Sequence, residues 1–245
     1  MPGSARDAWR NRLGNRRNCH PWRPARGRLY VSEPLKLAVL ISGNGSNLQS
    51  IIDAIELGRL NAQIKAVVSN NSAAYGLVRA TQHGLSTWVI DHRDYQDREQ
   101  YDGVLQHYLE SVAADYIVLA GFMRILGPGI IKAFAHRILN IHPSLLPAYK
   151  GLNTHQRALD DHATHHGVSI HLVTAELDDG PIICQARYPV EAGDRVEDLQ
   201  TKGHRLEHQM YPQVLCWLSD NKLTIEGGRL YYEKALLEQP ISFNP

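Results

Sequence analysis

A seven-residue apolar run, LKLAVLI at residues 35–41, leads directly into the glycine-rich turn SGNGSN at residues 42–47. A short and nearly continuous apolar run is typical of a central parallel strand whose two faces are both covered. After the turn, apolar residues recur at the spacing of a helix, at Leu48, Ile51, Ile52 and Ile55. Gly58 is suited to end this helix. Strand, glycine turn and helix in this order predict the first unit of an α/β fold.

The same alternation continues along the chain. Further strands are predicted at residues 64–68, 87–90, 116–120, 138–142, 168–174 and 182–190. Helices are predicted at residues 76–83, 94–113, 130–135, 154–162 and 196–217, and a hairpin at residues 222–232. The prediction is a single doubly wound α/β domain over residues 35–245, with a mainly parallel sheet, a Rossmann-like amino-terminal half and a carboxyl-terminal β-hairpin.

Residues 1–34 differ from the rest because eight arginines stand among Pro and Gly with few aliphatic side chains. Such a segment buries little apolar surface, so a basic, disordered extension or a misassigned start is predicted. A transit peptide or a nucleic-acid-binding arm is the alternative, although the segment lacks a clean amphipathic period and a secretory apolar core.

The overall composition limits the classes of partner. The 26 basic and 25 acidic residues give a formal charge of +1, which provides no argument for nucleic acid or an acidic membrane. Cys19, Cys184 and Cys216 are far apart, which suits reduced thiols in a cytoplasmic protein better than a disulfide framework. No apolar run approaches the roughly 20 residues that span a bilayer, so a soluble protein is predicted.

The stretch ILNIHPSLLP at residues 138–147 runs from an apolar strand into a loop bounded by prolines. It places Asn140 and His142 two residues apart at the strand end, so both point to one face. An amide that donates to an oxygen and an imidazole that carries a proton suit acyl chemistry. The alternative is structural, with Asn140 capping the strand end and His142 as a core histidine.

The glycine-rich turn lies where a strand ends and a helix begins, so its free N–H groups and the helix dipole favour an anion. Gly43 and Gly45 allow close approach of the backbone, and Ser46 and Asn47 add side-chain hydrogen bonds. Since the full G-x-G-x-x-G pattern and a Walker lysine are both missing, we expect a phosphate rather than a dinucleotide or ATP. A tight turn with an Asn or Ser cap is the alternative.

Two later loops add candidate residues. AGFMRIL at residues 120–126 suits an apolar slot for a flat heterocycle, although Met123 and Leu126 also read as ordinary core residues. In ELDDGP, Asp178 is placed to approach His142, fix its tautomer and raise its pKa. Asp179 competes for this role, and a solvated turn aspartate is the structural alternative.

The chain also has a histidine-rich stretch, His162, His165 and His166. We interpret it as a polar loop between two elements rather than a metal site, because no cysteine and no zinc spacing accompany it. His171, in the strand predicted next, is interpreted as a structural or positioning residue. No G-x-S-x-G motif is present, so a serine hydrolase is not supported.

Taken together, SGNGSNLQ, AGFMRIL, NIHPSLLP followed by YKGLNTH, and ELDDGP resemble the phosphoribosylglycinamide formyltransferases, a family of the folate-dependent formyltransferase superfamily. The resemblance extends from about Leu37 to the final hairpin. It implies transfer of the formyl group of 10-formyltetrahydrofolate to the amine of glycinamide ribonucleotide in de novo purine synthesis. It also implies a reaction without metal or covalent enzyme intermediate.

The resemblance assigns roles to matching positions. Asn140, His142 and Asp178 would be catalytic, stabilising a tetrahedral oxyanion, with protons moving through His142 or an ordered water. Residues that match the folate site are Arg98, Met123, Arg124, Ile125, Leu126, Asn140, Thr174, Ala175, Glu176, Leu177 and Asp178. Residues that match the ribonucleotide site are Gly45, Ser46, Asn47, His204, Arg205, Leu206 and Glu207.

Two features depart from the family pattern: Asp179, where many relatives have a small residue, and the basic extension. The main alternative is a formyltetrahydrofolate deformylase-like hydrolase, but residues 1–34 are too short and polar for its regulatory domain. A methionyl-tRNA formyltransferase would need an RNA-binding domain after the hairpin. A nucleotide-binding Rossmann-type module would leave NIHPSLLP and ELDDGP unexplained. Whether the protein is a monomer or a dimer stays open.

Overall fold

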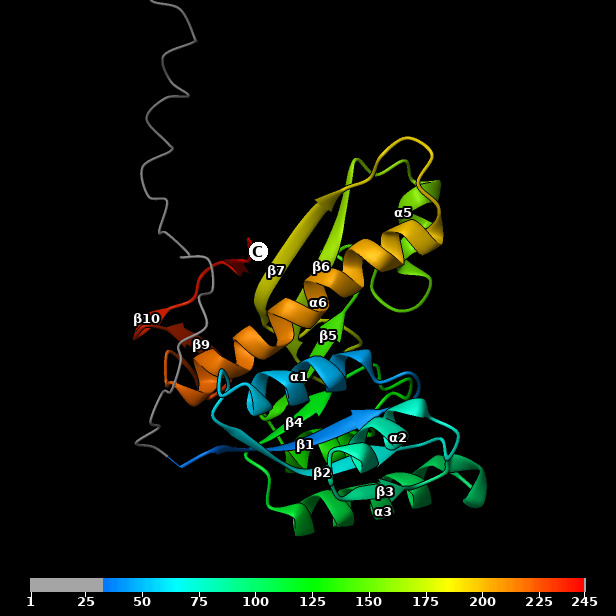
Figure 1. Cartoon of the computed structure of the whole chain (residues 1–245), viewed down its shortest axis with the longest axis vertical. Helices are drawn as coiled ribbons and strands as arrows, with labels where there is room; N and C mark the ends of the chain where they lie inside the picture. Colours follow the sequence, from blue (N-terminus) through cyan, green and yellow to red (C-terminus); the bar gives the residue numbers. More distant parts are fainter. Residues whose placement is uncertain (1–32, 245) are drawn as a thin grey trace, which may run out of the picture.

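The computed structural model describes residues 33–244, so the predicted basic extension lies, apart from its last two residues, outside the described part. Eight strands form one sheet in the order β11-β7-β6-β5-β4-β1-β2-β3 (Figure 1). Their bounds are β1 Leu35–Ile41, β2 Ala62–Ser69, β3 Thr87–Val89, β4 Tyr116–Leu119, β5 Ile138–His142, β6 His165–Leu172, β7 Ile182–Pro189 and β11 Ile241–Ser242. A small second sheet contains β8 Leu223–Glu226, β9 Arg229–Tyr232 and β10 Ala235–Leu236.

The strands β3, β2, β1, β4 and β5 pair in parallel, whereas β6 is antiparallel to both β5 and β7. This confirms an α/β fold with a mixed, mainly parallel sheet and a carboxyl-terminal hairpin. The chain runs from β1 outward to β3 and then returns to place β4 on the other side of β1. The carboxyl ends of β1 and β4 therefore border the point where ligands of open α/β sheets bind.

Helices cover both faces of the sheet (Figure 1). On one face lie α1 (Ser46–Glu56), α2 (Tyr75–Gln82) and the long α6 (Val196–Ser219), which contribute Leu48, Ala80 and Leu206 to one core cluster. On the other lie α3 (Arg98–Val112) and α4 (Pro128–Ala133), which contribute Leu105 and Ile130 to a second cluster. The helix α5 (Thr154–Asp160) joins β5 to β6. Side chains of β1 alternate between the two clusters, which explains its continuous apolar sequence.

Some element boundaries differ from the sequence prediction. The helix α3 begins at Arg98 rather than at 94, because Asp97 caps it by accepting a hydrogen bond from Gln100 N–H at 2.9 Å. A short 3-10 turn, His92–Asp94, precedes it. The strands β10 and β11 were not predicted, since two residues are too few to show a period.

The interpretation of the histidine-rich stretch as an inter-element loop is wrong for two of its residues. The strand β6 begins at His165, and the side chain of His166 is only 1% exposed. The rings of Tyr149, His155 and Tyr188 pack edge-on around His166. His162 lies before the strand and is exposed.

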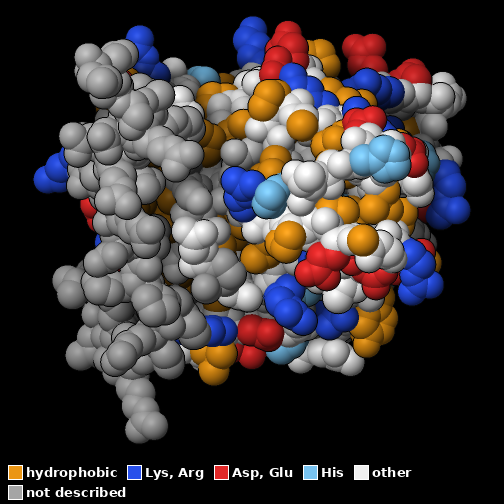
Figure 2. All heavy atoms as spheres, turned by 90° about the horizontal axis from the view of Figure 1, so that it is seen from above, with side chains coloured by type: hydrophobic (Ala, Val, Ile, Leu, Met, Phe, Trp, Pro, Cys, Tyr) orange, Lys and Arg blue, Asp and Glu red, His pale blue; other side chains and the backbone are white. Residues whose placement is uncertain are grey.

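On the face seen in Figure 2, acidic, basic and hydrophobic side chains are interspersed rather than gathered by type. Over residues 33–244, none of the helices is both long enough and apolar enough to cross a membrane.

Candidate active site

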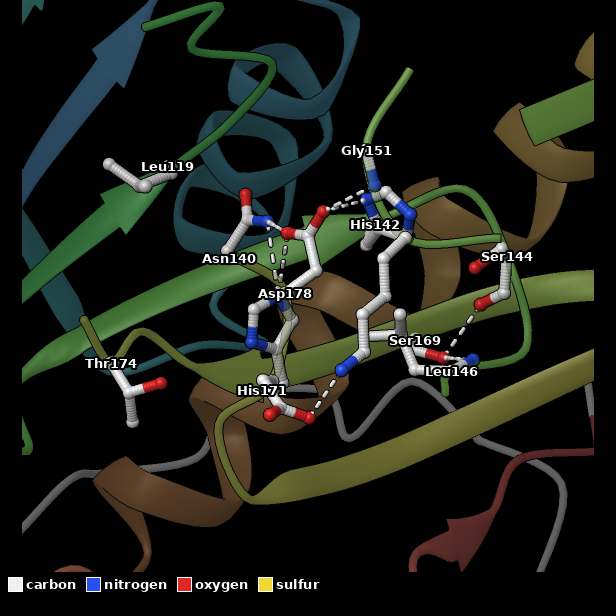
Figure 3. A network of polar contacts seen from close by, with 12 residues as sticks. Leu119, Asn140, His142, Ser144, Leu146, Gly151, Ser169, His171, Thr174 and Asp178 are labelled. Carbon is white, nitrogen blue, oxygen red and sulfur yellow. Dashed lines mark hydrogen bonds and ion pairs between the residues drawn. The ribbon is translucent and has the colours of Figure 1, made fainter. Parts of the chain in front are cut away.

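The ends of β5 and β6 bring four polar side chains together (Figure 3). Asn140 and His142 lie on β5, and the antiparallel register pairs Asn140 with His171 on β6. The loop after β6 then returns Asp178 to the same place. The structure therefore groups the three predicted catalytic residues and adds His171, which the sequence indicated only as a structural or positioning residue.

Both ring nitrogens of His142 face oxygen atoms. Nδ1 lies 3.4 Å from Asp178 Oδ2, and Nε2 lies 2.9 Å from the Tyr149 carbonyl oxygen. Burial lowers the pKa of His142, and the Tyr149 carbonyl and the Asp178 carboxylate only partly offset this effect. Asp178 therefore has the expected upward effect on the pKa of His142, but desolvation outweighs this effect, so the net pKa falls.

Asp178, and not Asp179, is the carboxylate beside His142. Asp178 adopts a left-handed backbone conformation with φ 49°, and its Oδ2 accepts a hydrogen bond from Gly151 N–H at 2.9 Å. Asp179 instead forms an ion pair with Lys150 at 2.5 Å. Burial would raise the pKa of Asp178, but the contacts with His171 and Gly151 and the nearby His142 outweigh burial and lower it.

Asn140 and His171, paired across β5 and β6, bring their polar side chains into contact. Nδ1 of His171 lies 2.8 Å from the Leu172 carbonyl oxygen, which can only accept, so Nδ1 carries the proton. Nε2 lies 3.1 Å from Asn140 Nδ2 and 3.5 Å from Asp178 Oδ1. The second Asn140 N–H points at Asp178 Oδ1 across 3.5 Å, a weak contact.

The glycine-rich turn has the geometry of an open helix start. Gly45 is the N-cap of α1 at φ 73°, and no side chain makes a capping hydrogen bond, so the predicted alternative of an Asn or Ser cap is wrong. A Cβ on Gly45 would lie 2.6 Å from Gly76 Cα, which explains the requirement for glycine. The guanidinium of Arg79, a residue that sequence reasoning missed, donates to the Asn44 carbonyl and side-chain oxygens at 3.0 and 3.2 Å.

The turn is joined to α6 by a buried hydrogen bond. Asn47 Nδ2 donates to Glu207 Oε2 at 2.7 Å, while Asn47 Oδ1 is buried and has no hydrogen-bond partner among residues 33–244. Burial raises the pKa of Glu207, and the hydrogen bond from Asn47 counteracts part of this rise. His204 and Arg205 are exposed, one turn or less before Glu207, whereas the side chain of Leu206 packs in the core.

The loop at residues 121–127, which follows β4, alternates buried and exposed side chains. Leu126 is buried, as its reading as a core residue predicted, but that reading is wrong for Met123, which is 72% exposed. Arg98 Nη2 donates to the Ile125 carbonyl oxygen at 3.0 Å. The Arg124 guanidinium lies 4.5 Å from the centre of the Tyr101 ring. Two cationic side chains thus hold the second half of this loop.

The segment before Asp178 presents its side chains outward. Ala175, Glu176 and Leu177 are exposed, and the Thr174 hydroxyl donates to the Glu176 carbonyl oxygen at 3.4 Å. These exposed residues lead directly into Asp178, which belongs to the polar group around His142. Within residues 33–244, no group of three His, Cys, Asp or Glu side chains is arranged to hold a metal ion.

Comparison with known proteins gives a consistent result. Residues 35–215 match the family model described as formyl transferase. The chain is 48% identical over 199 residues to the phosphoribosylglycinamide formyltransferase of Escherichia coli (strain K12), an alignment covering 81% of this chain and 94% of the relative. It is 44% identical over 202 residues to the Haemophilus influenzae enzyme of the same name, covering 82% and 95%.

A solved phosphoribosylglycinamide formyltransferase from Coxiella burnetii superposes with a TM-score of 0.82 at 46% identity. The superposition covers 86% of this chain and all of that one. The family model, the sequence alignments and the superposition agree over most of the chain, and the resemblance predicted from the motifs is confirmed. The chain belongs to the formyl transferase family, among the phosphoribosylglycinamide formyltransferases.

Proposed function

We propose that the protein transfers the formyl group of 10-formyltetrahydrofolate to the amine of glycinamide ribonucleotide, a step of de novo purine synthesis. The observation that carries the proposal is the grouping of Asn140, His142 and Asp178 beside two other strand ends. The glycine-rich turn follows β1, the loop 121–127 follows β4, and Asn140 lies near the end of β5. An anion site, a heterocycle site and an acyl-transfer centre thus stand side by side.

The ribonucleotide phosphate is assigned to Gly45, Ser46 and Asn47. The open start of α1 offers backbone N–H groups and the positive end of the helix dipole. Glu207 lies one hydrogen bond beyond Asn47 and is suited to accept from the amine or hydroxyl groups of the substrate. The ribonucleotide site is completed by His204, Arg205 and Leu206. Leu206 contributes its main chain, because its side chain lies in the core.

The folate co-substrate is assigned to the loop 121–127 and the segment Thr174 to Asp178. The main chain from Met123 to Leu126 supplies polar groups for the pterin edge, and the exposed Met123 and Ile125 side chains supply apolar surface. Arg98 supports this loop through the Ile125 carbonyl and is the cation suited to the acidic part of the folate.

The chemistry we infer is direct attack of the glycinamide amine on the formyl carbon. The negative charge that develops on the formyl oxygen is stabilised by an N–H of Asn140 and by the imidazolium of His142. The Asn140 N–H held at 3.5 Å by Asp178 is the one released for this purpose, since that contact is weak. The other N–H stays on His171 and keeps the amide in place.

His142 carries the proton in this scheme. Its lowered pKa means that the free enzyme holds a neutral ring near neutral pH. As the oxyanion forms, it and Asp178 favour the charged ring, and the ring takes up the proton that the attacking amine loses. The Nε2–H must leave the Tyr149 carbonyl to reach the substrate. The proton then passes from the attacking nitrogen to the departing folate nitrogen through His142 or a water molecule.

The test is an assay of purified protein with glycinamide ribonucleotide and 10-formyltetrahydrofolate, following the deformylated folate by absorbance. Absence of release with both substrates present would refute the proposal. Release of formate without the amine would instead support the deformylase-like hydrolase. Residues 35–245 are proposed as the catalytic domain. The cytoplasmic location and the choice between monomer and dimer stay predictions.

A further inference from the structure

Ser42 directly follows β1, which lies between β4 and β2 in the sheet and whose carboxyl end borders the candidate site. Its backbone N–H donates to the Gly121 carbonyl oxygen at 3.1 Å. Its hydroxyl oxygen accepts a hydrogen bond from the Met123 N–H at 2.8 Å. Both partners follow β4, so Ser42 bridges the point where the strand order reverses and where ligands of such sheets bind.

The direction of the Ser42 hydroxyl is set from the opposite side by the end of β2. Asn70 directly follows β2, is 7% exposed, and its Oδ1 accepts the Ser42 hydroxyl proton at 2.5 Å. Since a hydroxyl has one proton, this bond leaves the oxygen lone pairs to face the Met123 N–H. A single serine therefore links the ends of β2, β1 and β4.

We propose that Ser42 and Asn70 are positioning residues that orient the loop 121–127 for the pterin, an inference that rests on the proposed function. Arg98 and Arg124 hold the second half of this loop. Its first half contains Met123, whose side chain is 72% exposed and so is not held by packing. Phe122 anchors the loop in the second core cluster, and the hydrogen bond to Ser42 fixes the direction of the main chain at Met123, directly after this anchor.

The arrangement predicts an asymmetric effect on the two substrates. Removal of the hydroxyl leaves the backbone hydrogen bond of Ser42 to Gly121, and with it the glycine-rich turn, in place. The phosphate subsite should therefore be preserved while the loop 121–127 loses its orientation. A general loss of stability would instead affect both substrates.

The kinetic test compares Ser42→Ala with Ser42→Thr, which keeps the hydroxyl, and Asn70→Ala with Asn70→Asp, which keeps the acceptor. Loss of one neutral hydrogen bond predicts that Ser42→Ala raises the KM for the folate about five- to tenfold, and Asn70→Ala about threefold. The KM for the ribonucleotide should change by less than about twofold. Ser219→Ala is the matched control, because it removes a hydroxyl hydrogen bond to Asn61 O, which lies at the amino end of β2, away from the candidate site.

A second measurement does not depend on activity. Hydrogen exchange of the Met123 amide, measured without substrates, should be about tenfold faster in Ser42→Ala and near wild type in Ser42→Thr and Ser219→Ala. Unchanged exchange together with an unchanged folate KM would overturn the inference, as would an equal rise of both KM values. If the wild type transferred no formyl group, the proposed function would fail. The exchange rates alone would then show whether Ser42 holds the main chain at Met123.

Discussion

Asn47 and Glu207 are 160 positions apart in the chain and share a buried hydrogen bond of 2.7 Å. This bond joins the first turn of α1 to the middle of α6, so the two parts of the proposed ribonucleotide site form one unit. Glu207 is only 6% exposed, and burial raises its pKa. A buried carboxyl group with one neutral partner has acceptor capacity left for a substrate.

Glu207→Gln keeps the size of this side chain and removes its charge. We expect the KM for glycinamide ribonucleotide to rise about tenfold, because a hydrogen bond to a charged acceptor is stronger than one to an amide. The KM for the folate should stay near wild type. Glu197→Gln on the exposed first turn of α6 is the control and should change neither value.

His142→Ala and Asn140→Ala test the proposed acyl-transfer centre. Each removes a group that stabilises the oxyanion, so kcat should fall about a hundredfold or more with a smaller change in either KM. Circular dichroism and thermal unfolding establish that each variant is folded. Turnover near the wild-type rate in a folded variant would rule out the assigned role of that residue.

Asp178→Asn and Asp179→Asn form a matched pair of adjacent substitutions. Asp178 lies 3.4 Å from His142 Nδ1, so loss of its charge should lower the pKa of His142 further and reduce kcat about 10- to 100-fold. Asp179 pairs with Lys150 at the surface, and its replacement should leave kcat within about twofold. The kcat–pH profile of each variant gives the comparison, and equal profiles would contradict the assignment.

Gly45→Ala and Gly43→Ala separate two glycines of one turn. Gly45 has φ 73° and its added Cβ would lie 2.6 Å from Gly76 Cα, so the substitution should cost about 1–2 kcal/mol and raise the ribonucleotide KM. A Cβ on Gly43 has no atom within 4 Å, so this variant should unfold as the wild type does. Urea titration measures the free energy of unfolding, and equal stabilities would contradict the prediction.

Because the rings of His155 and His166 are buried, we expect the protein to lose stability in mild acid. Burial is the main cause that lowers the pKa of each ring to about 4, from the ordinary value of 6.5. Between these values the unfolded chain binds more protons than the folded one, so stability is full above pH 6.5 and falls as the pH approaches 4. Each ring should contribute a loss on the order of 3 kcal/mol.

The measurement is a set of urea titrations between pH 7 and pH 4. His166→Phe retains an aromatic ring among Tyr149, His155 and Tyr188 and takes up no proton, so it should show a flatter dependence on pH. Equal pH dependence in this variant and the wild type would show that His166 does not titrate on unfolding.

Much of the fold can be predicted from the sequence, because buried apolar residues recur with the period of a helix or a strand. The strand at residues 35–41 and the helix after the glycine turn are found where the pattern places them. The start of β6 was missed, because His165 and His166 look polar in sequence although His166 is enclosed by aromatic rings. A polar side chain is expected at the surface, but packing against aromatic rings can bury it, as it does for His166.

The sequence by itself determined the order of strands and helices, the family and the candidate residues, since each depends on local pattern or on short motifs. Only the tertiary structure decided that Asp178 rather than Asp179 faces His142, and that His171 holds the Asn140 amide. It also decided that the pKa of His142 moves down and not up. The physical reason is that these properties depend on backbone direction, strand register and desolvation, which arise between segments far apart in the chain.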